Sequence, residues 1–337
     1  MVHRQSNLVA TAARAHRSLL IKSSFTKRPV AHWRFKLMKI VILGAGGRLG
    51  AALMHEYREK YDIAGFNRAQ LDLANLNDLR QRLSAISFDV LINAAAFTDV
   101  DACETERDRA FLINADAPGI LAEICNAKNA KLIHVSTDYV FDGKKRAPYT
   151  EEDQANPISV YGESKLAGEK CVLAAENGHL VVRVSWVFGP DRPSFVDAMI
   201  KRAQQNEKID AISDKFSTPT YTHDIAHILP QFFDRSVAGG ILHFANAGKC
   251  TWQEYAQWAL DCCRDADISL KARTVGALKL NEMTRLRQGS GGQAPWIARR
   301  PVYSVLSTVK YTELSGTEPR AWREAVADYI TRFYSKK

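Results

Sequence analysis

Short apolar runs alternate with segments of helical periodicity between residue 39 and about residue 190. Segments in which apolar residues recur every three or four positions lie at 48–60, 75–85, 106–128 and 163–176. Strands that are apolar on both faces are typical of parallel sheets covered by helices on each side. The pattern predicts an α/β fold, a Rossmann-like doubly wound parallel sheet. Its strands are expected at Lys39–Leu43, Ile63–Phe66, Val90–Asn93, Leu132–Val135 and Leu180–Val184.

The alternation becomes irregular after Gly189-Pro190. A last helix is expected from Thr317 to about Tyr334, because a cap residue precedes Pro319 in the first turn. Other elements are expected near 195–205 and 222–235 as helices, and near 209–212 and 241–244 as strands. We predict a Rossmann domain at 38–190, completed by about 217–247, and a smaller, mixed C-terminal substrate lobe at 191–216 and 248–337. A glycine-rich stretch at 287–293 is interpreted as an exposed insertion.

The N-terminal 37 residues differ in charge from the rest of the chain. They carry eight Arg and Lys and no Asp or Glu, whereas the remainder has 38 basic and 37 acidic residues. The body is therefore nearly neutral, and nucleic acid is not expected as its partner. Three interpretations of the extension stay open: a transit peptide, a phosphate-binding arm, or an over-long translation of a chain that starts at Met38. We favour the last, because Met38 stands one residue before the first strand.

Hydropathy and cysteine content indicate the setting of the protein. No apolar run approaches the ~18 residues needed to cross a bilayer, so no membrane partner is expected. The six cysteines include no CxxC pair and are too sparse for a secreted disulfide scaffold. A reduced, cytoplasmic location is therefore predicted.

A glycine-rich loop follows the first predicted strand. Gly44, Gly47 and Gly50 form a GxxGxxG pattern at the point where the strand passes into a helix. Glycine is needed where the backbone must turn sharply and approach a pyrophosphate, and the helix N-terminus favours an anion. A plain tight turn would use the same residues, but the strand–loop–helix context favours a dinucleotide.

The end of the second strand favours NADPH over NADH, although NADH remains possible. It lacks the acid that would bind an unmodified ribose and instead has Asn67-Arg68. Arg68, helped by Arg48, is expected to contact a 2′-phosphate. Asp72 is expected either to accept a hydrogen bond from the adenine amino group or to cap the next helix.

A YxxxK motif supplies the candidate chemistry. Tyr161 and Lys165 lie four residues apart and share one face of a helix. An ammonium group near a phenol lowers the phenol pKa and favours proton transfer near neutral pH. Ser136-Thr137 follows the fourth strand, at the sheet edge where ligands bind in open α/β folds. We expect Thr137, Tyr161 and Lys165 to form one catalytic group.

These features resemble the extended short-chain dehydrogenase/reductase superfamily. The similarity is closest to the dTDP-4-dehydrorhamnose reductase family, and it covers residues 38 to about 334. The matching segments begin with Asn93-Ala-Ala-Ala-Phe-Thr98-Asp-Val100-Asp101-x-x-Glu104, Ser136-Thr137-Asp-Tyr139-Val-Phe-Asp-Gly143 and Tyr161-Gly-Glu-Ser-Lys165-Leu-Ala-Gly-Glu169. They continue with Arg183-Val-Ser-Trp186-Val-Phe-Gly189, Thr251-Trp252 and Arg299-Arg300-Pro301 with Ser304 and Leu306.

The resemblance implies reduction of the C4 ketone of dTDP-4-dehydrorhamnose by NADPH. Tyr161 would protonate the developing alkoxide, Thr137 would hydrogen-bond the same oxygen, and Lys165 would tune Tyr161 and hold the nicotinamide ribose. It also implies that Asn114 holds a proton-relay water. The expected cofactor-binding residues are Gly44, Gly47, Arg48, Leu49, Gly50, Asn67, Arg68, Asp72, Leu73, Ala94, Ala95, Ala96, Thr98, Tyr161 and Lys165.

The substrate residues come from the same resemblance. Thr98 and Val100 match positions that line the sugar or cofactor pocket, and Tyr139 and Trp186 match positions that contact the hexose. Thr137 is also expected to contact the substrate. Arg299 or Arg300, with Arg300 preferred, would pair with the diphosphate. Some members hold magnesium through an acid two positions after the third glycine. Ala52 stands there in this chain, so no metal and no Mg²⁺ are expected. His134 is expected to be a hydrogen-bonded core residue, and a homodimer is a further hypothesis.

Two other classes of function stay open. One is a reductase or epimerase acting on a different nucleotide sugar. A dehydratase is disfavoured, because Tyr139 replaces the acid that commonly follows the aspartate. The other is a non-catalytic, NADP-binding regulatory subunit of the methionine adenosyltransferase type.

Overall fold

The computed structural model describes residues 37–175, 178–283 and 296–335. The glycine-rich stretch predicted at 287–293 and nearly all of the basic extension lie outside the described residues. The described chain from Leu37 onward forms one compact unit. None of its helices is both long and apolar enough to cross a membrane.

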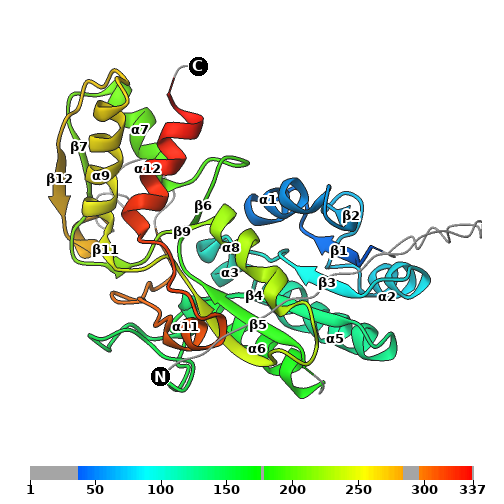
Figure 1. Ribbon diagram of the computed structural model, residues 1–337. Coiled ribbons are helices and arrows are strands. Elements are labelled where there is room, and N and C mark those ends of the chain that lie inside the picture. The colour runs from blue at the N-terminus through cyan, green and yellow to red at the C-terminus, as the bar shows by residue number, and fades with distance from the viewer. Residues whose placement is uncertain (1–36, 176–177, 284–295, 336–337) are drawn as a thin grey trace, which may run out of the picture. The chain divides into compact units, whose positions relative to one another are not determined.

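A six-stranded parallel sheet forms the centre of this unit (Figure 1). Its strands follow the order β10-β5-β4-β3-β1-β2, so the chain runs outward from β1 to one edge and then to the other. All five neighbouring pairs are parallel, which confirms the predicted fold class. The strands are β1 (Lys39–Leu43), β2 (Asp62–Phe66), β3 (Val90–Asn93), β4 (Lys131–Thr137), β5 (Leu180–Val184) and β10 (Gly240–Phe244).

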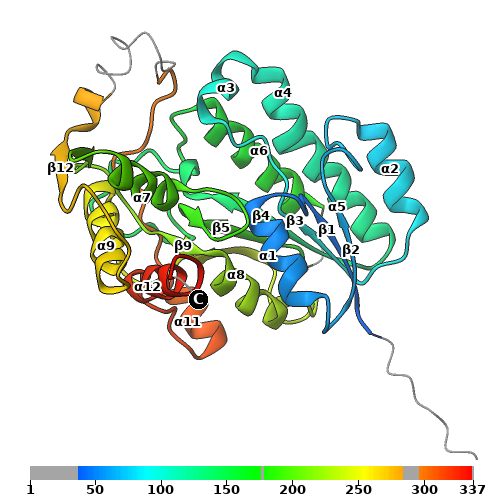
Figure 2. The ribbon, with the colours of Figure 1, turned by 90° about the horizontal axis from the view of Figure 1, so that it is seen from above.

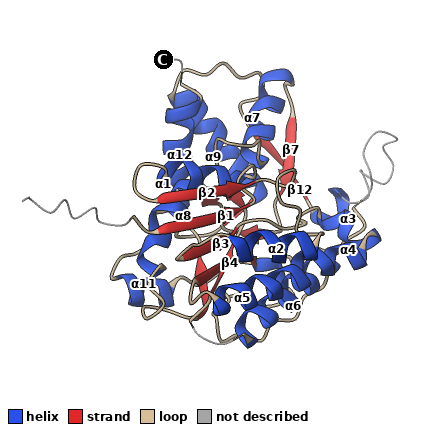
Figure 3. Ribbon diagram, turned by 90° about the vertical axis from the view of Figure 1, so that its right-hand side faces the viewer, coloured by secondary structure: helices blue, strands red, loops and turns tan. Residues whose placement is uncertain are grey.

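Helices cover both faces of the sheet, because successive strand residues point to opposite sides (Figures 2 and 3). Ile40 and Ile42 of β1 belong to one buried cluster, and Val41 and Leu43 belong to the other. The first cluster is covered by α1 (Arg48–Tyr57), α8 (Thr222–Ile228) and α11 (Val309–Ser315). The second is covered by α2 (Leu76–Ala85), α5 (Ala117–Ala127) and α6 (Val160–Ala174).

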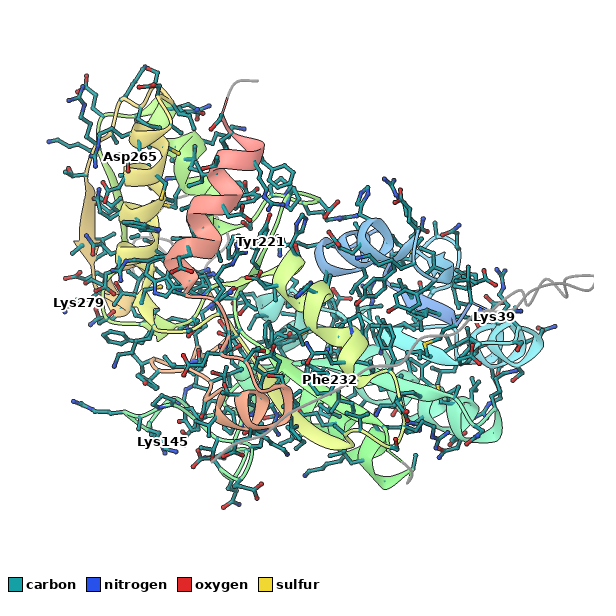
Figure 4. The ribbon with its side chains drawn as sticks, viewed as in Figure 1. Lys39, Lys145, Tyr221, Phe232, Asp265 and Lys279 are labelled. Carbon is teal, nitrogen blue, oxygen red and sulfur yellow. The ribbon has the colours of Figure 1, made fainter. Side chains whose placement is uncertain are left out.

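A smaller lobe stands beside the sheet and packs around its own aromatic and aliphatic cores (Figure 1). It consists of α7 (Phe195–Gln205), α9 (Trp252–Asp265), α12 (Trp322–Phe333) and the parallel pair β7 (Ile209–Ile212) and β12 (Val275–Leu278). Two short pairings belong to the connections: β6 (Val187–Phe188) with β9 (Thr220–Tyr221), and β8 (Phe216–Ser217) with β11 (Cys250–Thr251). Tyr221, labelled in Figure 4, stacks on Phe188 at 5.1 Å and meets Tyr329 of α12 edge-on.

Several boundaries differ from those predicted. The last helix begins at Trp322 instead of Thr317, because Ala247 pairs with Ala321 and holds the preceding segment extended. The range 248–337, predicted as lobe, includes α11, which packs against β10 of the sheet. Helix 222–235 is shorter than expected, since α8 passes into a 3₁₀ turn at Leu229–Phe232.

Candidate active site

A cavity of about 680 Å³ lies at the carboxyl ends of the parallel strands. Its walls come from the loops after β1, β2, β3 and β4 and from the segment after β5. Parallel strands bring their carboxyl ends to one edge of the sheet, where open α/β folds bind ligands. Chain segments far apart in the sequence therefore meet around one space.

The glycine loop forms one end of the cavity. Gly44 adopts a left-handed φ of +78°, and the N–H groups of Gly44 and Ala45 both donate to the Phe66 carbonyl. A Cβ on Gly50 would lie 2.0 Å from the Gly44 oxygen, so only glycine lets α1 begin this close to the strand. The loop thus presents the open N-terminus of α1, which favours an anion.

The polar residues after β2 border the same region. Asn67, Arg68 and Asp72 line the cavity, and the Arg68 side chain is 70% exposed, with its Nε 3.5 Å from Asp72 Oδ2. Asp72 Oδ1 accepts from the backbone N–H of Ala74. The alternative in which Asp72 caps α2 is wrong, because Asn75 is the cap and accepts from Asp78 N.

Arg48 lines the cavity but makes contacts that the sequence did not predict. Its guanidinium donates to three carbonyl oxygens of β6 and of the segment that joins β6 to α7: Val187 at 3.3 Å, Arg192 at 3.2 Å and Pro193 at 2.6 Å. Arg192 in turn donates from Nε to the Gly46 carbonyl at 2.6 Å. These hydrogen bonds hold Arg192 on the cavity wall, where no motif of the sequence predicted it.

The segment after β3 is fixed by Asn114. This residue sits in a π-helical turn, Leu112–Asp116, and its side-chain amide bonds both backbone groups of Phe97, accepting at 2.9 Å and donating at 3.0 Å. Its Nδ2 also donates to Ser164 Oγ on α6. The side chain therefore clamps the β3 loop to α6, and the relay role implied by the resemblance stays a prediction.

Thr137, Tyr161 and Lys165 line the middle of the cavity together. Thr137 ends β4, and its hydroxyl donates to Asp138 and accepts from the N–H of Tyr139. Ser159 caps α6 by accepting from Gly162 N, which fixes the first turn and with it Tyr161. Lys165 follows one turn later on the same face.

The Lys165 ammonium is fully buried. Its Nζ lies 2.7 Å from the Val135 carbonyl and 3.2 Å from His134 Nε2, and burial lowers the pKa of Lys165 to about 8. Burial also lowers the pKa of His134. Its Nδ1 lies 3.1 Å from Asn93 Nδ2. His134 is thus a hydrogen-bonded core residue that also positions Lys165.

The electrostatics of Tyr161 differ from the expectation. Burial raises the pKa of its phenol above the usual value, and Asp138 adds to the rise, while the Thr137 hydroxyl opposes it. The phenol pKa is raised and not lowered, so the prediction that Lys165 lowers it is wrong. A raised pKa keeps the phenol protonated, which is the form that a proton donor needs.

An aromatic wall closes the side toward the lobe. Trp186 lines the cavity with a left-handed φ of +44°, which costs a non-glycine residue energy. Its ring meets Phe195 at 5.1 Å, Trp252 at 5.2 Å and Tyr255 at 4.8 Å. These rings hold the strained residue in place and orient a flat apolar surface.

Arg300 belongs to a different contact from the one predicted. Its guanidinium pairs with Asp101 at 2.5 Å, lies 4.3 Å from the centre of the Trp296 ring, and does not line the cavity. Asp101 also accepts from the backbone N–H groups of Ile297 and Ala298. The pair ties α3 (Val100–Thr105) to the C-terminal segment.

The other predicted residues mostly meet in this cavity. Gly50 lies outside it and serves the packing of α1, and Arg300 is tied to Asp101. The predicted residues that line the cavity are Gly44, Gly47, Arg48, Leu49, Asn67, Arg68, Asp72, Leu73, Ala94, Ala95, Ala96, Thr98, Val100, Thr137, Tyr139, Tyr161, Lys165 and Trp186. Among the described residues, no group of His, Cys, Asp and Glu is placed to hold a metal ion.

Comparisons with known proteins match nearly the whole described chain. The family model RmlD substrate binding domain matches residues 38–335. A dTDP-4-dehydrorhamnose reductase of Mycolicibacterium smegmatis is 38% identical over 295 residues, covering 87% of this chain and 85% of the relative. The spore coat polysaccharide biosynthesis protein SpsK of Bacillus subtilis is 33% identical, covering 87% and 97%.

A solved structure agrees with these relatives. The dTDP-4-dehydrorhamnose reductase of Bacillus anthracis, crystallised in complex with NADP, has a TM-score of 0.79 to this chain and 32% sequence identity. The similarity covers 88% of this chain and 99% of the other. The matches confirm the family resemblance read from the motifs: the chain belongs to the RmlD substrate binding domain family.

Proposed function

We propose that this protein reduces the C4 ketone of dTDP-4-dehydrorhamnose to dTDP-L-rhamnose with NADPH. One observation carries the proposal: a single cavity is lined by the glycine loop, by Thr137, Tyr161 and Lys165, and by Trp186. A phosphate-binding loop, a proton donor and an apolar wall are what a cofactor and a deoxysugar need side by side. Relatives of 31–38% identity carry the same activity in their names.

The site suits a nicotinamide dinucleotide in its residues as well as its shape. The backbone close to Gly44 and Gly50 has no room for a side chain, which leaves the N-terminus of α1 open to a pyrophosphate. NADPH bound there supplies a hydride. The Val135 carbonyl and His134 hold the Lys165 ammonium in place. Its further role in this proposal is to donate a hydrogen bond to a hydroxyl of the nicotinamide ribose.

Proton transfer falls to Tyr161. Its buried, protonated phenol donates to the oxygen that becomes an alkoxide, and Thr137 hydrogen-bonds the same oxygen. Tyr139 meets the Tyr161 ring edge-on at 5.7 Å and restricts its motion. Thr98, Val100 and Trp186 are the proposed sugar contacts, and an aromatic ring suits the apolar C6 methyl group and C–H face of a deoxysugar.

The test is turnover by the purified full chain. The substrate is made in situ from dTDP-4-keto-6-deoxyglucose with a 3,5-epimerase, and NADPH oxidation and the product sugar are both followed. The proposal predicts dTDP-L-rhamnose, formed in proportion to the NADPH consumed. Tight NADPH binding without any sugar reduction would contradict it and would favour a regulatory, NADP-binding subunit.

A second nucleotide sugar is a defined alternative. A relative that is 34% identical is named a probable dTDP-4,6-dihydroxy-2-methyloxan-3-one 4-ketoreductase. Parallel assays with that ketone measure kcat/KM for both substrates. We expect the dehydrorhamnose to be preferred, and a reversed preference would reassign the substrate while keeping the chemistry.

The cytoplasmic location and the homodimer stay predictions. Cell fractionation tests the first and light scattering of the purified chain tests the second. A membrane-bound fraction or a monomeric mass would contradict the corresponding prediction.

A further inference from the structure

The loop between β6 and α7 reaches over the glycine loop. In Figure 1 this green segment approaches α1, and the contact is made by Arg48 and Arg192. Arg48 donates to two carbonyl oxygens of this loop and to one of β6, and Arg192 extends from the loop to the Gly46 carbonyl. The two arginines are 144 positions apart in the sequence, so no short motif reveals them.

The Arg192 guanidinium lies beside the end of β2. A Cβ built on Gly46 would stand 3.9 Å from Arg192 Nη2 and 3.3 Å from Asn67 Cβ, so the three residues are neighbours. Arg192 is exposed. Within the described residues, only its Nε donates a hydrogen bond, to the Gly46 carbonyl. The two Nη groups are thus available to an anion in the cavity.

The charges around this point favour a phosphate. Arg48, Arg68 and Arg192 all line the cavity, and the end of β2 has Asn67 where an acid would bind an unmodified ribose. Asp72 is the nearby carboxylate, and it already faces Arg68 at 3.5 Å. Arg48 donates to carbonyl oxygens and Arg68 faces Asp72, whereas the Nη groups of Arg192 have no carbonyl or carboxylate partner within the described residues. Arg192 is therefore the arginine of this group whose donors can bind an anion beside Asn67.

We propose that Arg192 binds the 2′-phosphate of NADPH and makes this chain selective for NADPH over NADH. Arg48 is the positioning residue that holds the loop carrying Arg192. The inference rests on the cofactor of the proposed function. It places cofactor selection on the loop that leads into α7 of the substrate lobe, outside the strand–loop–helix unit that binds the rest of the dinucleotide.

The test measures dissociation constants for NADPH and NADH in the full chain by quenching of protein fluorescence. Arg192→Gln is expected to weaken NADPH at least tenfold and NADH less than threefold, because a charge-assisted hydrogen bond is lost only with NADPH. Arg192→Lys keeps the charge and is expected to retain part of the selectivity. Equal weakening of both cofactors, or no change in either, would overturn the inference.

Matched variants test the role of each arginine. Arg68→Gln, on the same rim, is expected to change the NADPH constant less than threefold, and a selective loss there instead of at Arg192 would overturn the assignment. Arg48→Met alone is expected to reduce selectivity for NADPH. In a chain that already carries Arg192→Gln it is expected to have no further effect, because Arg48 acts through Arg192. Equal effects of Arg48→Met in both backgrounds would refute its positioning role.

These binding measurements need no sugar. A native chain that binds NADH as tightly as NADPH would overturn the inference and leave the reductase proposal intact. Conversely, NADPH selectivity that depends on Arg192, in a chain that fails to reduce the sugar, would support the inference and contradict the proposed function.

Discussion

The two ends of the cavity are built in different ways. At the end where hydride transfer is proposed, which we call the hydride end, Tyr161 and Lys165 stand one helical turn apart and Thr137 ends strand β4, so regular elements set their positions. At the phosphate end, Arg48 and Arg192 come from segments 144 residues apart and meet through hydrogen bonds to backbone carbonyls. The proposed catalytic residues thus lie on regular elements, whereas the proposed contact with the 2′-phosphate of the cofactor lies on a loop.

The largest expected effect lies at the hydride end. Tyr161→Phe removes the proton donor without changing the shape of the ring, and kcat is expected to fall by about 10²–10⁴-fold. The NADPH dissociation constant is expected to stay within about twofold. Single-turnover kinetics and cofactor titration measure the two quantities, and a variant with normal turnover would remove Tyr161 from the mechanism.

Trp186 sharpens the comparison, because it combines a proposed substrate contact with backbone strain. Both Trp186→Ala and Trp186→Gly remove the aromatic wall, and each is expected to raise KM for the sugar about tenfold or more. Only glycine relieves the left-handed φ of +44°. Trp186→Gly should therefore be more stable than Trp186→Ala by roughly 1 kcal/mol in chemical denaturation. Equal stability of the two variants would contradict the strain.

A buried polar network that includes Ser136 of the cavity wall makes the stability of the protein depend on pH. There, Ser136 Oγ donates to Glu169, Glu169 pairs with Arg183, and Arg183 meets His243 at 3.3 Å, all buried. Burial, with Arg183 adding to it, lowers the pKa of His243 to about 3. Between pH 6.5 and about 3 the unfolded chain binds a proton that the folded chain refuses, so the free energy of unfolding falls as pH falls.

His243→Gln isolates this contribution. The variant is expected to lose part of the slope of stability against pH in that window, at most about 1.4 kcal/mol per pH unit. Urea denaturation at a series of pH values gives both slopes. An unchanged slope would mean that His243 takes up its proton in the folded state as readily as in the unfolded chain.

Arg68→Ala is expected to have the smallest effect. Its side chain is 70% exposed and already faces Asp72, so the loss of NADPH affinity should stay below about threefold at physiological salt. Cofactor titration at two salt concentrations measures it. A large, NADPH-selective loss would move the 2′-phosphate contact to the end of β2 and break the contrast between the two ends.

The sequence predicted the sheet and the meeting of Thr137, Tyr161 and Lys165 in one cavity, because both depend on local pattern, while the catalytic roles of these residues stay a prediction. Continuous apolar strands, a glycine loop and a YxxxK helix each occupy one stretch of chain. The contacts of Arg48 and Arg300 could not be predicted, since their partners Val187 and Asp101 are distant in sequence. The predicted lowering of the Tyr161 pKa was also wrong, because burial raises the pKa and the segments that bury this residue cannot be read from the YxxxK motif.

Deuteride transfer tests the central claim most directly. The full chain is mixed with NADPH deuterated at the transferred C4 position and with dTDP-4-dehydrorhamnose, and the product is analysed by mass spectrometry and proton NMR. The account predicts dTDP-L-rhamnose with one deuterium at sugar C4, lost in Tyr161→Phe together with turnover. Product without deuterium, or with the label at another carbon, would contradict direct hydride transfer to the C4 ketone in this cavity.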